Sequence, residues 1–349
     1  MRLFYALILF YIFSSQIFAS SADTIALQKK VKYDTNYIIS YRDWLHITFV
    51  GINQQTGISL KEAINGKDLV FATNNPFSYG VGIDYEWFTF EFSKSFKKFE
   101  YTDKRKGQTQ SSTIRLGYTG RKIRLSSYYS NSKGYYLKNI EDYLPDWDHD
   151  KIDYPRFDDL KNKTIVLSLY YTFLHKTYSN MAAMWQLDRQ IKSSGSPVIG
   201  LLTLWEGISA TSPFHFSDTL NLVDDFLNIK KIDYKRIGLL AGYMHTISIM
   251  KHFYIHAALT QGLFYSYGTI DNFNNIKTNK NALGLSIYYR LSLGYNGDRF
   301  YAGILYLKDS FVSDITESTI LVSSYDYLRL LAGYRFPIKK RKWMKKIYL

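Results

Sequence analysis

The sequence contains no cysteine, and only six of its 349 residues are proline. The first absence excludes a disulfide framework, a thiolate metal site and a lipid anchor on an N-terminal cysteine. The scarcity of proline favours long uninterrupted strands, because proline cannot donate to a strand ladder. Apolar runs of about 20 residues, which a membrane-spanning helix needs, are also missing. The composition therefore argues against a helical membrane protein.

Aromatic residues are what the sequence has in excess. It contains 32 tyrosines and 23 phenylalanines, and aromatic residues make up 17% of the chain, although its mean hydropathy is only −0.21. A membrane-spanning β-barrel has this combination, because apolar side chains that face lipid alternate with polar ones that face the lumen. Tyrosines also gather at the lipid–water boundary of such barrels.

The residues from Phe253 onward show the pattern most clearly. Alternation with a period of two predicts a strand, because successive side chains of a strand point to opposite faces. The run far exceeds the ~5–6 residues of an average soluble strand and reaches the ~9–11 that a transmembrane strand needs. A long strand of a soluble β-sandwich is the alternative. The apolar or aromatic positions are Phe253, Ile255, Ala257, Leu259, Leu263, Tyr265 and Tyr267.

Similar strands are joined alternately by short turns and by long polar connections. Six long connections predict six hairpins, and therefore an all-β, antiparallel transmembrane barrel of about 12 strands. Its short turns would lie in the periplasm and its long loops outside the cell. The six connections are Gln54–Phe77, Lys97–Gln108, Lys133–Lys163, Thr211–Lys235, Asp271–Lys280 and Lys308–Glu317.

The segment His175–Ser196 decides between two strand counts. Twelve strands require that this segment adds no pair of spanning strands. We therefore predict that its sequence MAAMWQLDRQ lies inside the barrel or in the periplasm, as a plug does. If Trp185 and Leu187 instead face lipid on a spanning strand, a barrel of 14 strands is the better prediction.

The two ends of the chain differ from its middle. Residues 1–22 have the early arginine, the apolar stretch and the small residues of a secretory signal, with cleavage after Ala19 or Ala22. We assign residues 23–43 to a periplasmic lead-in segment, 44–336 to the barrel and 337–349 to a basic periplasmic tail. That tail holds six of the basic residues behind the net charge of +14. This organisation predicts location in the cell outer membrane.

Five motifs occur along the chain in the order YRDWL, GVGIDYEWFTFEF, SKGYYL, RQIKSSGS and LLAGYRF. As a set, they resemble an uncharacterised family of Bacteroidetes outer-membrane barrels that is known as a domain of unknown function. The likeness extends over Tyr41–Phe336. The resemblance implies a β-barrel in the outer membrane of a Gram-negative bacterium, and it implies no activity and no functional residues.

Charged residues are predicted on the inner face of this barrel. A charge that faces lipid at mid-membrane costs ~2–4 kcal/mol, so charged residues that alternate with apolar ones should face inward. An excess of arginine favours anions if the lumen is open. In a narrow lumen, the same arginines would pair with acids and tyrosine hydroxyls and fill it. The predicted inward charges are Asp84, Glu91, Arg115, Arg124, Arg290, Arg329 and Arg335.

Known catalytic and metal-binding patterns are not found. His252 and His256 would lie ~13 Å apart on a strand, too far for one metal ion. The run DWDHD spaces its carboxylates like a calcium loop, but Lys151 occupies the position of the required glycine, so we predict a solvated acidic loop. The sequence has neither a nucleophile elbow nor a phosphate-binding glycine loop. We therefore assign no catalytic residue, no metal ligand and no cofactor.

Three functions remain open from the sequence. The first is a channel or transporter for small hydrophilic or anionic solutes, and the second is a non-conducting barrel with a structural, assembly or surface-binding role. The third is a lipid-modifying barrel enzyme. The expected partners are outer-membrane lipid and the outer-membrane assembly machinery, with a small anionic solute if the lumen is open and no nucleic acid. The sequence identifies no protein partner.

Overall fold

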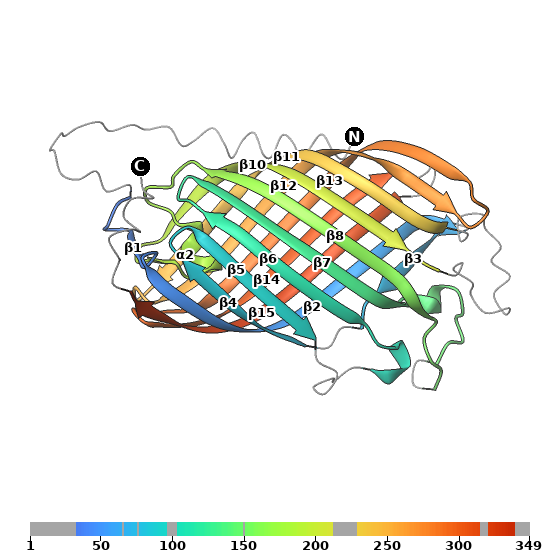
Figure 1. Ribbon diagram of the computed structural model, residues 1–349, viewed down its shortest axis with the longest axis horizontal. Helices are drawn as coiled ribbons and strands as arrows, with labels where there is room; N and C mark the ends of the chain where they lie inside the picture. The colour runs from blue at the N-terminus through green and yellow to red at the C-terminus, as the bar shows by residue number, and fades with distance from the viewer. Residues whose placement is uncertain are drawn as a thin grey trace. The chain divides into compact units, whose positions relative to one another are not determined.

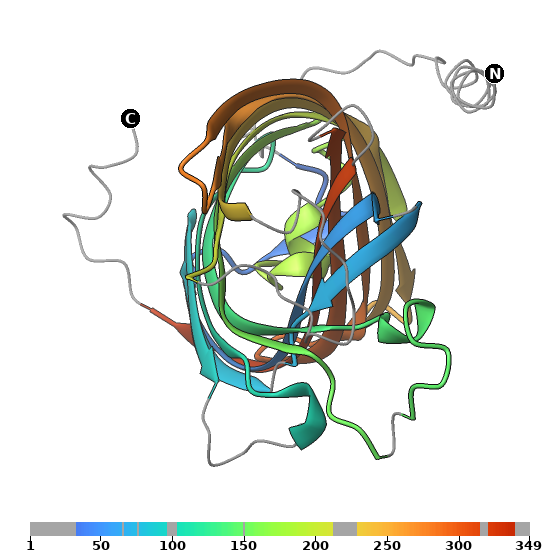
Figure 2. The ribbon, with the colours of Figure 1, turned by 90° about the vertical axis from the view of Figure 1, so that its right-hand side faces the viewer.

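The structure is a computed structural model, and it describes residues 33–64, 66–74, 77–95, 103–148, 151–211, 229–314 and 320–338. These residues form one antiparallel sheet that closes into a barrel (Figures 1 and 2). The ring closes where β15 (Ile320–Pro337) pairs with β2 (Trp44–Ile64) along nearly its whole length. The predicted signal segment, its cleavage site and residues 339–349 of the basic tail lie outside the described residues.

The sheet has thirteen strands, but in it the chain runs from one end of the barrel to the other only twelve times, and we call each such run a crossing. β3 (Lys67–Ala72) and β4 (Ser78–Tyr85) pair with opposite halves of β2 and run in the same direction, so they form one interrupted crossing. The predicted count of 12 is therefore confirmed. The remaining strands are β5 (Phe88–Ser95), β6 (Gln110–Thr119), β7 (Ile123–Leu137), β8 (Arg156–Thr172), β10 (Ser194–Ser209), β11 (Ile229–Ile249), β12 (Phe253–Asn272), β13 (Lys277–Asn296) and β14 (Phe300–Asp314).

Most strands are longer than the alternation of apolar residues predicts. β2 continues to Ile64, β14 reaches Asp314, and β12 and β13 leave only residues 273–276 between them. The predicted loops at these places are therefore wrong in part. Above the lipid the outer face of a strand meets water, so its outward side chains need not be apolar while the backbone hydrogen bonds continue. Residues 212–228, within a further predicted loop, are outside the described ranges.

The outer face of the barrel is apolar. Large apolar side chains are exposed there, with Leu263 56%, Leu283 67% and Phe49 67% accessible. The alternation predicted from Phe253 is confirmed, because Phe253 is exposed whereas the intervening Tyr254 is buried. A continuous apolar belt of this kind is the surface that a membrane-spanning barrel presents to lipid. Aromatic side chains border the belt near the short turns, including Trp87, Phe88, Tyr118, Phe173, Phe300 and Phe336.

The inner face carries two stacked groups of buried side chains. Nearest the long loops, an apolar cluster includes Leu69, Phe71, Leu137 and Leu321, and we call it the mouth cluster. Closer to the short turns, β12, β13, β14 and β15 contribute to a second cluster that includes the aromatic residues Phe264, Tyr288, Phe311 and Tyr325. Two 3₁₀ helices, η2 (Lys104–Lys106) and η3 (Ile140–Asp142), lie in the long connections.

A short segment occupies the barrel at its short-turn end. The helix α2 (Asn180–Met184) lies within the ring in the end view (Figure 2), and β9 (Asp188–Gln190) forms a two-stranded sheet with β1 (Ile38–Ser40). We call residues 177–191 the plug. Leu187 is 0% exposed, so the predicted inward segment is confirmed and the alternative of 14 strands is wrong. No helix in the described ranges has the length and apolar character that crossing a membrane requires.

Candidate functional site

The seven charged residues predicted for the lumen lie on the inner face of the strands. Five of them line an internal cavity of about 80 Å³, namely Glu91, Arg115, Arg124, Arg290 and Arg329. That volume holds on the order of five water molecules. The lumen at this level is therefore a small wet pocket between packed layers. The four members that are almost completely buried are Asp84, Glu91, Arg329 and Arg335.

Glu91 contacts two of the arginines that line this cavity. Its carboxylate lies 2.7 Å from Nη2 of Arg329 and 3.8 Å from Nε of Arg115. The hydroxyl of Tyr327 donates to Glu91 Oε1 at 2.7 Å. The guanidinium of Arg115 lies 4.0 Å from the centre of the Tyr327 ring. Two predicted arginines thus share one predicted acid, so the three side chains together carry one net positive charge.

Two further acids, which the sequence reasoning missed, bind the predicted Arg290 and the additional Arg236. Asp309 Oδ1 lies 2.5 Å from Nη1 of Arg290, across the cavity from Glu91. Glu206 is completely buried, and its Oε2 lies 2.7 Å from Nη1 of Arg236. The hydroxyl of Tyr325 also donates to Glu206, at 2.5 Å. The first pair lines the cavity, and the second is a buried pair of the lumen.

The reason for each omission is physical. Asp309 was assigned to a loop because β14 was predicted to end before it. Glu206 lies on the same face of β10 as Leu204 and Ile208, which are apolar yet face inward. The rule that apolar side chains face lipid fails there, because the upper lumen is itself packed with apolar side chains. The signal that could have found Glu206 is that a charge on an otherwise apolar strand needs a buried partner.

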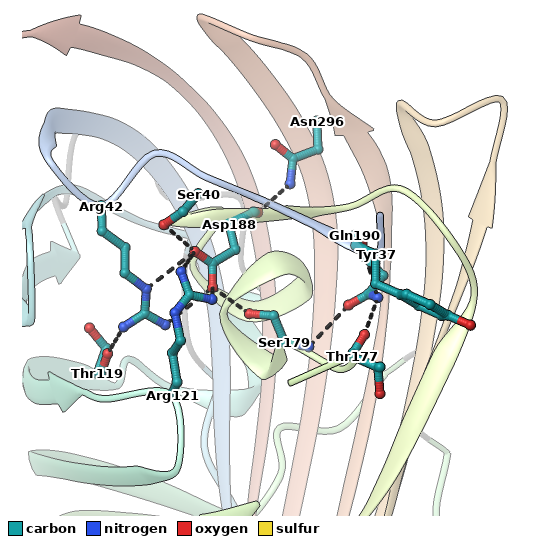
Figure 3. A network of polar contacts seen from close by, with 10 residues as sticks. All are labelled: Tyr37, Ser40, Arg42, Thr119, Arg121, Thr177, Ser179, Asp188, Gln190 and Asn296. Carbon is teal, nitrogen blue, oxygen red and sulfur yellow. Dashed lines mark hydrogen bonds and ion pairs between the residues drawn. The ribbon is translucent and has the colours of Figure 1, made fainter. Parts of the chain in front are cut away.

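Asp188 of β9 fixes the plug to the barrel (Figure 3). Its two carboxylate oxygens accept hydrogen bonds from Arg42 at 3.2 Å and from Arg121 at 3.3 Å. Ser40 donates to Oδ1 at 2.8 Å, and Ser179 donates to Oδ2 at 2.6 Å. The donors come from β1, the approach to β2, the turn between β6 and β7, and the residue before α2. One carboxylate therefore joins four separate parts of the chain.

The charge state of Asp188 follows from these contacts. Burial by itself would raise the pKa of this carboxyl group, but Arg42 and Arg121, with the hydrogen bonds from Arg42 and Ser179, more than offset burial. The pKa of Asp188 consequently lies below its ordinary value, and the group is ionised at neutral pH. The pKa of the nearby Tyr41 shifts upward. Burial and the hydrogen bond to Asp298 raise the pKa of Tyr41 to about 12.

Arg335, predicted as a lumen charge, is a second anchor of the plug. Its Nη2 donates to the carbonyl of Gln186 at 2.6 Å and to Oδ1 of Asn296 at 2.5 Å. Nη1 donates to the carbonyl of Asp298 at 3.1 Å. The guanidinium also lies 4.1 Å from the centre of the Tyr41 ring. Arg335 thus binds backbone and ring atoms at the base of the plug, and a solute could not reach it.

The described residues bring few histidines and acids close together. There, no group of three or more histidines and acids is placed to hold a metal ion. The buried His256 bonds to the hydroxyl of Thr246 at 3.0 Å and stacks on Tyr178. In the predicted acidic loop, Asp148 forms an ion pair with Lys151 at 2.8 Å. His149 and Asp150 of that loop lie outside the described ranges.

A family model described as a domain of unknown function (DUF4421) matches residues 32–336. The chain belongs to this family. The match spans the barrel and the plug of this DUF4421 protein, and the family predicted from the five motifs is confirmed. A comparison with curated proteins gave no match.

Several solved structures are similar to this DUF4421 protein at low identity. The outer membrane protease OmpT of Escherichia coli is 8% identical, with a TM-score of 0.39 over 85% of this chain and 98% of that one. The β domain of the Bordetella autotransporter BrkA is 10% identical, with a TM-score of 0.33 over 84% and 99%. The toluene transporter TbuX of Ralstonia pickettii is 10% identical, with a TM-score of 0.28 over 84% and 90%. Similarities of this size carry no argument about function.

Proposed function

We propose that this protein is an outer-membrane barrel that does not conduct ions and that has a structural or surface-binding role. The observation that carries the proposal is the filling of the lumen at successive levels. The mouth cluster lies at one end and the plug at the other, with the Glu206 and Glu91 pairs between them. The apolar outer belt supports a place in a membrane.

The pairing of charges supports a closed lumen over an anion pore. A ring of arginines selects anions when its charges face an open path. Here Arg236, Arg290 and Arg329 each lie within 2.7 Å of a carboxylate oxygen. Removing one partner of a buried pair costs about 3–5 kcal/mol, so these pairs resist opening.

Conductance in a planar bilayer tests the proposal. The folded full-length chain is expected to give no stepwise ionic current at moderate voltage, while a known porin under the same conditions conducts. Insertion is checked in the same sample by heat-modifiable migration on a gel and by protection of the barrel from protease. Stepwise current from the inserted, unmodified protein would overturn the proposal.

The location is a separate part of the proposal. The protein is expected to fractionate with the outer membrane, after folding by the outer-membrane assembly machinery. Depletion of that machinery should reduce the heat-modifiable form. Recovery of the folded chain as a soluble periplasmic protein would contradict both the location and the role.

One observation favours a second candidate, a transporter for small anions with a movable plug. Arg124 lines the 80 Å³ cavity beside Trp185 of the plug and, among the residues that the structure describes, has no carboxylate partner. In this alternative, the plug must leave before anions pass. Replacing Arg115, Arg124 and Arg290 by Gln should then lower the anion selectivity of a variant whose plug is released by Asp188→Ala. Absence of current from that released variant would remove the candidate.

A further inference from the structure

Strands β5–β8 carry four lysines on their outer face near the long-loop end. Lys94, Lys133, Lys161 and Lys163 are exposed and line a surface hollow of about 680 Å³. Every other side chain that lines it is an uncharged polar one. We call this surface the rim patch. It has the composition of an anion-binding surface.

Strand register brings the four lysines together. Lys94 of β5 lies opposite Ser112, which lies opposite Asn131, which lies opposite Lys163 of β8. Neighbouring strands are ~4.8 Å apart, so this row spans ~14 Å at the backbone. Its two ends carry lysines, and its centre offers a hydroxyl and an amide.

The next row toward the long loops places two lysines directly opposite each other. Lys133 of β7 pairs in register with Lys161 of β8. Like charges directly opposite on one face of a sheet destabilise it. At the same end of the barrel, Lys231 has an acidic partner, Asp233, at 3.0 Å. In the described part of the chain, none of the four rim-patch lysines has one. An external anion would offset the repulsion.

The height of the rim patch indicates which anion reaches it. Each strand places an apolar residue two positions closer to the short turns, at Phe92, Ile114 and Ile165 on β5, β6 and β8. Two residues of strand correspond to ~7 Å. The lysines therefore lie immediately above the apolar belt, where their alkyl chains cover apolar surface while their ammonium groups reach the headgroup level.

We propose that the rim patch binds phosphate groups on the headgroup of an outer-leaflet lipid. Lysine ammonium groups bind phosphate as point charges, and the hydroxyl and amide between them supply further hydrogen bonds. The long loops of such barrels face outward, which places the patch in the outer leaflet. This assignment rests on the outer-membrane location proposed above. Free phosphate offers the same chemistry, so a test must separate the two sources.

Binding of phosphorylated lipid A to the folded full-length protein in zwitterionic detergent tests the assignment. The variant K94Q/K133Q/K161Q/K163Q should bind at least ~100-fold more weakly, because each lysine near an anionic headgroup contributes roughly fivefold. A matched control removes four exposed or half-exposed lysines from β11 and β13 at the same end, as K230Q/K235Q/K277Q/K280Q. It should change affinity by less than ~3-fold. Replacing the four rim-patch lysines by Arg should retain binding, with folding checked by heat-modifiable migration.

The probes separate the sources of phosphate. Dephosphorylated lipid A should bind the unmodified protein as weakly as phosphorylated lipid A binds the fourfold Gln variant. Inorganic phosphate should compete only at concentrations at least ~100-fold above those of lipid A, because it engages fewer lysines. Equal affinity for inorganic phosphate would assign the patch to free phosphate and overturn the lipid assignment. Equal losses in the two fourfold variants would overturn the site itself.

These outcomes are independent of conductance. A protein that binds lipid A through the rim patch and also conducts would keep this assignment and overturn the closed-barrel proposal. A protein that inserts into zwitterionic vesicles, does not conduct and does not bind lipid A would keep the closed-barrel proposal and overturn this assignment. Failure to insert into any vesicle would remove the membrane location on which both depend.

Discussion

The two ends of the lumen are closed by different chemistry. At the short-turn end, Asp188 and Arg335 hold the plug through charged and polar contacts. At the long-loop end, the mouth cluster brings together apolar side chains such as Leu69 and Phe71. Side chains at both ends are buried, but one closure depends on charge and the other on exclusion of water.

The difference follows from how each closure is built. The plug is a short segment that enters the barrel from outside the sheet, so directional bonds must fix its position. The mouth cluster is made largely by the strands that form the wall, whose register already places its side chains. Apolar contacts have no preferred direction and suffice there. The two ends should therefore respond differently to the same kinds of perturbation.

The largest effect is expected from Asp188→Ala. The change leaves Arg42 and Arg121, whose side chains are 16% and 14% exposed, without their carboxylate. Removing one partner of a buried ion pair costs about 3–5 kcal/mol. The free energy of unfolding, measured with denaturant, should fall by this amount. Hydrogen exchange in residues 177–191 should become faster.

Asp298→Ala is the matched control for that prediction. Asp298 pairs with Arg189 of the plug at 3.0 Å, but its side chain is 73% exposed. Arg189 is itself only 8% exposed, but water screens the Asp298 side of the pair, so the expected contribution is about 1 kcal/mol. Equal losses for the two variants would mean that apolar packing of α2, and not the bonds to Asp188, holds the plug.

The second effect concerns the mouth cluster. Phe71→Ala should lower the free energy of unfolding by about 3 kcal/mol, because a buried phenylalanine leaves a cavity. Phe71→Leu keeps most of the volume and should cost less than about 1.5 kcal/mol. Increased hydrogen exchange should be confined to β2, β3 and β7. Loss of plug protection in Phe71→Ala would show instead that the two closures are coupled.

The sequence predicts the plug and the number of crossings because both follow from strong local signals. Alternation identifies the lipid-facing residues of each crossing, and MAAMWQLDRQ does not alternate. Strand length could not be predicted in the same way. The last residues of β2, β12 and β14 rise above the lipid, where apolar alternation is no longer required.

The sequence does not predict which charged residues pair with one another. Arg329 and Glu91 could be placed on the inner face, but their pairing depends on register across a ring closed by distant strands. Asp188 is the clearest case. Its ligands Arg42 and Arg121 lie 146 and 67 residues away, and no pattern in the sequence connects them. The rim patch likewise emerges only when the register of β5–β8 is known.

The third prediction is that acid weakens the closure by the plug more than the closure by the mouth cluster. The pKa of Asp188 is lower in the folded protein than its ordinary value, so its contribution to stability is complete above the pKa of a free aspartate, ~3.9. That contribution is lost as pH falls below ~3.9 and through the lower folded pKa. Protease protection of residues 177–191 should therefore be constant from pH 8 to 5 and decline below about pH 4.

Asp188→Asn isolates this acid effect from other carboxyl groups. The variant should already be less protected at neutral pH, and its protection should change less between pH 5 and 3 than that of the unmodified protein. The mouth cluster, judged by hydrogen exchange in β3, has no carboxyl group among its buried members and should respond less. A plug whose protection falls equally in Asp188→Asn would assign the acid response to another group.

The smallest effect is expected from Arg124→Gln, which tests whether every lumen arginine holds the closure. Among the described residues Arg124 has no carboxylate partner, and its guanidinium lies 5.9 Å from the centre of the Trp185 ring. A contact of this kind contributes about 0.5–1 kcal/mol, so the free energy of unfolding should fall by no more than that. Arg329→Gln leaves buried Glu91 without its nearest cation and should cost several times as much. A rise in stability on replacing Arg124 would identify a charge kept in the cavity at a cost to folding, which favours the anion-transporter candidate over the closed barrel.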